Sequence, residues 1–284
     1  MRVRRIGAIT AAAAAATLVL SSCGLVGGSA EYESILQKAE ETGTLVIGVK
    51  YDQPGLGLET PEGPVGFDVD VATYVAGQLG VTPENIEWVE TASSNREPFL
   101  EQGQVDLVFA TYSITEERQD IVSFGGPYYV AQQDILVAAD NNDINSPEDL
   151  ADQPLCSASG SRSAETITET MEIPAQLREA GNYSECIELL SGGSVAAVTT
   201  DNIILAGFAA QRPGELRMLN QPFQEERYGV GMPHGDTETC EAVNAAIAQM
   251  WEDGSAAEFL ENHFGETDFA YAEEQPDFEP CPAA

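Results

Sequence analysis

Basic side chains are scarce in this chain of 284 residues. It contains 12 lysines and arginines against 47 aspartates and glutamates, which gives a formal net charge of −35. Nucleic acids and anionic lipid surfaces are poor partners for such a chain, because a phosphate backbone is bound through a basic surface. The acidity instead indicates a highly soluble protein.

Metal-binding and catalytic patterns are also missing. The two histidines, His234 and His263, lack the spacing of zinc ligands, and the sequence contains no CxxC pair. The acidic stretch 140–143 lacks the glycine and the terminal glutamate of a calcium loop. The sequence shows neither a GxSxG motif nor a Ser–His–Asp arrangement. We therefore expect no metal, no cofactor and no catalytic function.

Long apolar runs are limited to the N-terminus. A basic segment, Met1–Arg5, precedes the Ala-rich run Ile6–Leu20, whose 15 residues are too few to span a bilayer comfortably. Residues 1–22 are therefore predicted to be a cleaved export signal, and its removal takes the net charge from −35 to −38. The junction Leu-Ser-Ser-Cys resembles the bacterial lipobox, which implies that Cys23 is lipid-modified and that residues 23–34 form a flexible tether. A plain secretory signal with an accidental cysteine is the alternative.

Cysteines are few, and with Cys23 taken by lipid an even number remains. These are Cys156, Cys186, Cys240 and Cys281. An even count in an exported protein predicts two disulfides, for which three pairings are possible. We favour Cys156–Cys186 with Cys240–Cys281, because each bond then stays within one region of the chain.

Strand and helix patterns alternate along the rest of the sequence. Strands or extended segments are expected at 45–49, 86–89, 105–110, 128–138, 155–158, 176–179, 195–199, 216–220 and 227–231. Helices are expected from Gly66, at 96–101, from Pro147, and at 161–171, 183–190, 202–210, 238–251 and 255–262, with Gly125–Pro127 as a break. Alternation of this kind predicts an α/β fold with parallel sheets flanked by helices. The segments 99–113 and 189–203 share a helix end, a glycine, a buried strand and a polar loop, which suggests two similar lobes.

The loops that follow the two repeated strands carry opposite charges. One holds Arg118 and the other holds Asp201. Ligands of open α/β sheets bind at the carboxyl ends of the strands. A free amino acid needs a forked cation for its carboxylate and an acid for its ammonium, and this pair supplies both. The polar partners expected nearby are Thr111, Ser113, Ser161 and the backbone N–H groups at Gly160. A solvated surface arginine is the alternative interpretation of Arg118.

Several motifs, taken in their order, resemble one protein family. They are "IGVKYDQPGLG", "GFDVDVATYVAGQLG", "NREPFLEQGQVDLVFATYSITEER", "SGSRSAET", "YSECIELL", "AVTTDNIILAG" and "YGVGM". Together they resemble the extracellular solute-binding proteins (family 3) of amino-acid ABC importers, and among these the glutamate-binding lipoproteins of actinobacteria.

The resemblance implies a two-lobed, type II periplasmic-binding-protein-like clamshell, in which each lobe is a mostly parallel sheet flanked by helices. The expected divisions are 35–138 and 223–265 for lobe 1, 139–222 for lobe 2 and 266–284 for an acidic tail.

The resemblance also implies a role for each site residue. Arg118 and Ser161 would hold the α-carboxylate, and Asp201 would take the α-ammonium with Thr111 and Ser113. Arg96 would reach a side-chain carboxylate, with Lys50 as a second partner. A structural salt bridge is the alternative for both of these cations. Arg162 stands where relatives often have threonine, so it either adds a cation to the pocket or presents only its backbone N–H.

The implied function is capture of an acidic amino acid, glutamate or aspartate, by a monomeric lipoprotein. The protein would be anchored by lipid to the outer face of the cell membrane and would deliver its ligand to the permease subunits of an ABC importer. The alternatives are a binder of glutamine or another polar amino acid, a sensor lobe, or an exported enzyme of the same fold such as a cyclohexadienyl dehydratase.

Overall fold

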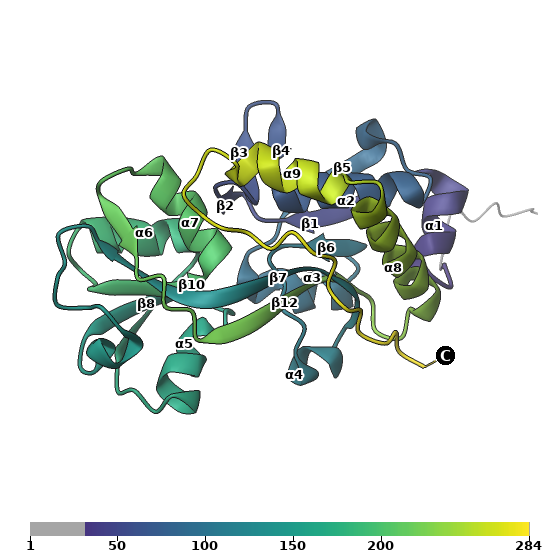
Figure 1. Cartoon of the computed structure of the whole chain (residues 1–284). Coiled ribbons are helices and arrows are strands. Elements are labelled where there is room, and N and C mark those ends of the chain that lie inside the picture. The colour runs from purple at the N-terminus through teal and green to yellow at the C-terminus, as the bar shows by residue number, and fades with distance from the viewer. Residues whose placement is uncertain (1–31, 284) are drawn as a thin grey trace, which may run out of the picture. The chain divides into compact units, whose positions relative to one another are not determined.

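The computed structural model describes residues 32–283 (Figure 1). The expected export signal, Cys23 and most of the expected tether lie outside these residues. Within them, no helix has both the length and the apolar character needed to cross a membrane.

One nine-stranded sheet organises the described chain. Eight of its strands follow the order β5 (Ile86–Glu90), β1 (Leu45–Val49), β6 (Leu107–Phe109), β12 (Gln224–Met232), β7 (Ser123–Ala138), β10 (Ala197–Asp201), β8 (Pro154–Ala158) and β9 (Gln176–Ala180), while β11 (Leu216–Met218) pairs with β7. Strand β1 is parallel to β5 and β6, and β8 is parallel to β9 and β10. We call β5, β1 and β6 the first half-sheet and β10, β8 and β9 the second half-sheet. The two long strands β7 and β12 are antiparallel and run side by side between them (Figure 1).

Helices cover both half-sheets, so the expected α/β class is confirmed. They are α1 (Ile35–Thr42), α2 (Phe67–Gln78), α3 (Arg96–Glu101), α4 (Glu116–Gln119), α5 (Ser163–Glu165), α6 (Tyr183–Ser191), α7 (Asn202–Gln211), α8 (Thr237–Glu252) and α9 (Ser255–Phe264). Helix α2 contacts β1 and β6, and α6 contacts β8 and β10. Apolar side chains such as Ile47, Leu107 and Val198 are fully buried, as continuous apolar strands require when helices cover them.

Three local expectations were wrong. Strand β7 does not break at Gly125–Pro127 but continues through it, with a cis bond at Gly126–Pro127. A Cβ on Gly125 would lie 2.7 Å from Val243, so the glycine allows α8 to approach the strand rather than making a turn. The helix expected from Pro147 is only a 3₁₀ turn, Pro147–Leu150, and the one expected at 161–171 is α5 followed by a π turn at Thr166–Thr170.

The sequence also did not predict a small sheet beside the first half-sheet. It consists of β2 (Asp52–Gln53), β3 (Gly57–Thr60) and β4 (Gly63–Val65). Its three strands are two to four residues long, too short to give an alternating pattern.

Both predicted disulfides are confirmed. Cys156–Cys186 joins β8 to α6, and Cys240–Cys281 joins α8 to the C-terminal tail. The tail is held by further contacts, since the backbone N–H of Glu279 donates to the carbonyl of Gly126 at 2.8 Å and its carboxylate pairs with Arg227. Each crosslink is worth roughly 3–4 kcal/mol on a chain-entropy model.

Candidate functional site

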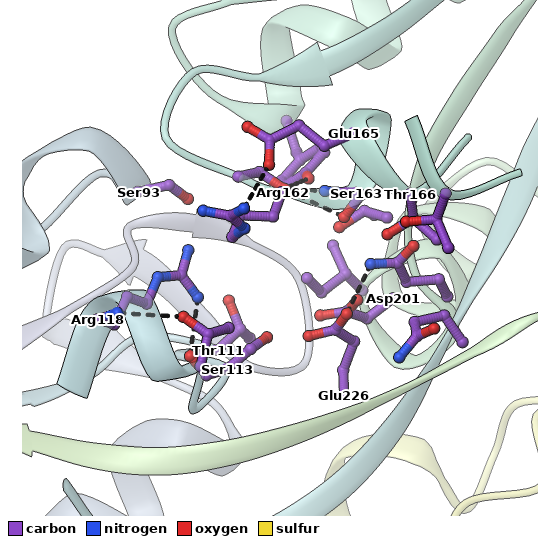
Figure 2. Close-up of a pocket in the computed structure, with 18 of the residues that line it drawn as sticks. Ser93, Thr111, Ser113, Arg118, Arg162, Ser163, Glu165, Thr166, Asp201 and Glu226 are labelled. Carbon is purple, nitrogen blue, oxygen red and sulfur yellow. Dashed lines mark hydrogen bonds and ion pairs between the residues drawn. The ribbon is translucent and has the colours of Figure 1, made fainter. Parts of the chain in front are cut away.

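A cavity of about 250 Å³ lies where the carboxyl ends of the two half-sheets face each other (Figure 2). Seven of the nine ligand residues predicted from the sequence line it: Arg96, Thr111, Ser113, Arg118, Ser161, Arg162 and Asp201. The other two, Lys50 and Gly160, lie behind its wall and contact residues that line it. The sequence therefore predicted most of the polar wall, because each of its loops follows a parallel strand.

Arg118 is fixed on one side of the cavity by its own loop. The hydroxyl of Thr115 caps α4 by accepting the Arg118 backbone N–H at 3.3 Å. The guanidinium donates to the carbonyls of Ser113 at 2.8 Å and Gly160 at 3.2 Å, and its Nε lies 3.2 Å from Glu97 Oε1. These contacts use three of its five N–H donors, so two remain for an anion in the cavity.

Arg96 is a buried cation whose hydrogen bonds all go to carbonyl oxygens. Its side chain is stacked over the ring of Tyr112, with the guanidinium carbon 4.4 Å from the ring centroid, and the residue is 2% exposed. The carbonyls that it bonds, at 3.0–3.2 Å, belong to Ser93, Ala110, Thr111 and Gly160. Carbonyls satisfy the N–H groups but do not neutralise the charge, so Arg96 still needs a counterion.

Lys50 adds a third buried cation. It is 3% exposed, and its Nζ donates to the hydroxyl of Ser93 at 2.8 Å. Burial, reinforced by Arg96, lowers the pKa of Lys50 to about 7, although Asp52 and Asp68 oppose the shift. Burial and the neighbouring Arg118 lower the pKa of Arg96 to about 10.

These three buried side chains, Lys50, Arg96 and Arg118, lie at or behind the cavity wall, and we call them the cation cluster. Within residues 32–283, the bond from Arg118 to Glu97 is the one ion pair that any of them makes. Buried charges in proteins are normally paired, so the cluster is suited to binding an anion.

Lys50→Met is expected to stabilise the ligand-free protein and to weaken binding of an anionic ligand. The charged form of Lys50 is disfavoured in the fold, where its pKa is about 7 against 10.5 in the unfolded chain. Its destabilising effect is therefore complete below pH 7 and fades as the pH rises towards 10.5. Urea denaturation should show a gain of at least about 1 kcal/mol at pH 6 that shrinks at pH 9. An equal gain at both pH values, or a loss, would contradict the assignment.

Thr111 lines the cavity and has a strained backbone. Its φ of 45° is rare for a β-branched residue, and such strain is found at functional sites. Two buried neighbours hold this backbone conformation in place. Asp68 Oδ2 accepts the backbone N–H of Thr111 at 2.8 Å, and Gln53 Oε1 accepts its hydroxyl at 3.2 Å.

Asp201 faces the arginines from the end of β10 (Figure 2). It is 5% exposed, and Tyr228 donates its hydroxyl to Oδ2 at 2.6 Å. Burial, followed by the nearby carboxylate of Glu226, raises the pKa of Asp201 to about 7. A ligand ammonium beside it would favour the charged form and lower that pKa.

The loop after β8 reaches across to the first half-sheet. Gly160 has φ +76°, and a Cβ there would lie 2.5 Å from the backbone of Ser94. This close approach places the Gly160 carbonyl where it accepts from both Arg96 and Arg118. Ser161, next in the chain, accepts the hydroxyl of Tyr183 at 2.7 Å.

Arg162 adds little net charge to the cavity. Its guanidinium pairs with Glu117 and lies 2.9 Å from Glu165 Oε2. Its side chain is also 42% exposed, so it belongs to the rim of the cavity rather than to the cation cluster.

Further contacts join the two halves beside the cavity. Asp52 of β2 accepts the backbone N–H groups of Tyr183 and Ser184 at 3.0 and 3.1 Å, which caps the N-terminus of α6. A Cβ on Gly207 of α7 would lie 2.0 Å from the carbonyl oxygen of Pro54. These contacts could not be predicted from the sequence, because they depend on how α6 and α7 meet the small sheet.

Two residues that line the cavity, on the long strands β7 and β12, were not predicted from the sequence. Gln133 of β7 and Glu226 of β12 both line the cavity, and Gln133 is almost completely buried. Both lie in segments whose sequence predicts only extended structure, and their place in the cavity depends on strand register.

Comparisons with known proteins agree with this geometry. The family model of the bacterial extracellular solute-binding proteins, family 3, matches residues 45–266. Glutamate-binding protein GluB of Corynebacterium efficiens is 43% identical over 273 residues, covering 92% of this chain and 91% of that protein. GluB of Corynebacterium glutamicum is 40% identical over 283 residues, covering 96% and 94%. Among solved structures, an ancestral arginine-binding protein bound to arginine matches with a TM-score of 0.73 and 33% identity, covering 78% of this chain and 99% of its own.

These likenesses confirm the two-lobed type II fold that the sequence motifs implied. The relatives are binding proteins, which supports the expectation that the chain is not an enzyme. Because the family model matches most of the chain and the sequence identity to these relatives is high, the chain belongs to the bacterial extracellular solute-binding proteins of family 3.

Proposed function

We propose that this protein binds an acidic amino acid, glutamate in the first place, and delivers it to the permease of an ABC importer. The main support for this proposal is the cation cluster. Among the described residues only Arg118 of the cluster has a carboxylate ion-pair partner, so Arg96, and Lys50 when it is protonated, favour a ligand with more than one negative group in a chain whose net charge is −35. The two similar proteins named as glutamate-binding support the same choice.

The roles of the individual residues follow from their positions. Arg118 and Ser161 would hold the α-carboxylate, and Asp201 with Thr111 and Ser113 would take the α-ammonium. Arg96 would face the side-chain carboxylate. Lys50 would act through Ser93, because the hydroxyl of Ser93 accepts from Lys50 and lines the cavity.

Closure around the ligand is part of the proposal. Lobe 1 would comprise residues 35–138 and 223–265, and lobe 2 residues 139–222, with β7 and β12 crossing between them. A ligand that contacts Arg118 and Asp201 together binds the closed arrangement best, and it would shift the population towards that state.

The membrane attachment is also a proposal. Proteins of this family are exported, and a lipid on Cys23 would keep the mature, monomeric protein at the outer face of the cell membrane.

A thermal-shift screen of the mature protein against the common amino acids tests the function. Glutamate, followed by aspartate, should raise the melting temperature most, because a ligand that binds only the folded state stabilises it. A larger rise with a neutral or basic amino acid would reject the acidic ligand, and no rise with any amino acid would reject the function.

A further inference from the structure

A second carboxylate stands beside Asp201 in the cavity. Strand pairing places Asp201 directly opposite Gln133, and Gln133 directly opposite Gln224. Directly paired residues share a face of the sheet, and Glu226, two residues beyond Gln224, points to that face as well. Figure 2 shows Asp201 and Glu226 side by side, with Arg118 on the opposite side of the cavity.

The side-chain amide of Gln133 holds Glu226 in place through its nitrogen, while its oxygen has no hydrogen-bond partner among the described residues. Its Nε2 donates to Glu226 Oε1 at 2.6 Å, which leaves its Oε1 as an acceptor. That oxygen is buried and has no hydrogen-bond partner in the part of the chain that the structure describes. A buried acceptor without a donor is unfavourable, and it points to a ligand group that donates to it.

We propose that Asp201, Glu226 and Gln133 Oε1 form a three-acceptor site for a primary ammonium group. This inference rests on the proposed binding of an amino acid, and it adds Glu226 as a second charged partner of the α-ammonium. Each of the three N–H bonds of a primary ammonium finds one acceptor, so Glu226 and Gln133 would take the place of Thr111 and Ser113 as partners of the ammonium. An amino acid that is alkylated on nitrogen has fewer N–H donors, so the site selects against it.

The charges around Asp201 also make ligand binding depend on proton release. The titratable or charged groups that act on it are Glu226 and Tyr228 from β12, Arg96 from α3, Arg118 from α4 and Tyr183 from α6. Burial and Glu226 raise the pKa of Asp201 to about 7, so near neutral pH the empty site holds a proton for part of the time. An ammonium takes the place of that proton, so binding at pH 7 releases protons from Asp201. An anionic ligand near Lys50, whose pKa is also about 7, takes protons up there, so the difference between variants reports on Asp201.

The test compares Glu226→Gln with Glu225→Gln, which makes the same change of charge on the adjacent, exposed residue of β12. Glutamate is titrated into each variant and the unchanged protein at pH 7, in buffers with different ionisation enthalpies. Glu226→Gln should weaken binding about tenfold and reduce the number of protons released. Glu225→Gln should match the unchanged protein in both respects. A fall in proton release with the affinity of Glu225→Gln would show that Glu226 only raises the pKa of Asp201, and the three-acceptor site would then be wrong.

N-methylglutamate provides a second measurement that needs no variant. The unchanged protein should bind it at least about tenfold more weakly than glutamate. If Glu226→Gln behaves like Glu225→Gln, or N-methylglutamate binds as well as glutamate, the three-acceptor site is wrong while amino-acid binding stands. If the unchanged protein binds no amino acid, the proposed function and this inference fall together.

Discussion

Arg118→Ala is expected to abolish binding of every amino acid tested. The side chain is the forked cation nearest to the proposed α-carboxylate, a group that all amino acids share, and its loss also leaves Glu97 without its partner. Removing one member of a desolvated charge pair costs roughly 2–5 kcal/mol, which corresponds to a loss of affinity of about thirtyfold to several thousandfold. Titration calorimetry with glutamate and glutamine measures both losses.

The matched control is Arg178→Ala on β9, where the arginine is exposed. It removes the same charge from the same acidic molecule and should leave both affinities unchanged. Similar small effects for the two variants would show that Arg118 does not contact the ligand.

Arg96→Ala is expected to weaken glutamate by at least about thirtyfold and glutamine by much less. Glutamate brings a second carboxylate that would be left desolvated without Arg96, whereas the side chain of glutamine is neutral. The variant also frees the carbonyls that Arg96 bonds, which lowers the affinity for both ligands. The informative quantity is therefore the difference between the two losses.

Arg217→Ala controls for the lost carbonyl bonds. Arg217 donates to the carbonyls of Asn141 and Ile144, outside the proposed site. Its removal should lower the melting temperature but leave the preference for glutamate intact. Equal losses of glutamate and glutamine in Arg96→Ala would show that Arg96 is scaffold, and the role in selectivity would pass to Lys50.

The elements with strong local signals could be predicted from the sequence. Continuous apolar runs identified β1 and the strand at β6, and the even cysteine count led to both disulfides. The predicted break at Gly125–Pro127 was wrong because glycine and proline are typical of turns, whereas β7 continues through them. The packing of Val243 against that point can be known only from the fold.

The candidate site also contains residues that could be predicted from the sequence and residues that could not. Thr111 and Arg118 follow β6, Asp201 ends β10, and they come together because the carboxyl ends of the two half-sheets face each other. That ligands bind at the carboxyl ends of strands is a rule of topology that can be applied to a sequence. Gln133 and Glu226 meet only through the register of two long antiparallel strands, far apart in sequence. The position of Lys50 behind Ser93, rather than in the cavity, also depends on tertiary packing.

In the proposed function, the cation cluster is matched to a second carboxylate on the ligand. Titration calorimetry of the unchanged protein with glutamate and with glutamine at pH 7 measures this match, because the two ligands differ only in a carboxylate against a carboxamide. We expect glutamate to bind at least about tenfold more tightly. Equal affinities, or tighter binding of glutamine, would contradict it.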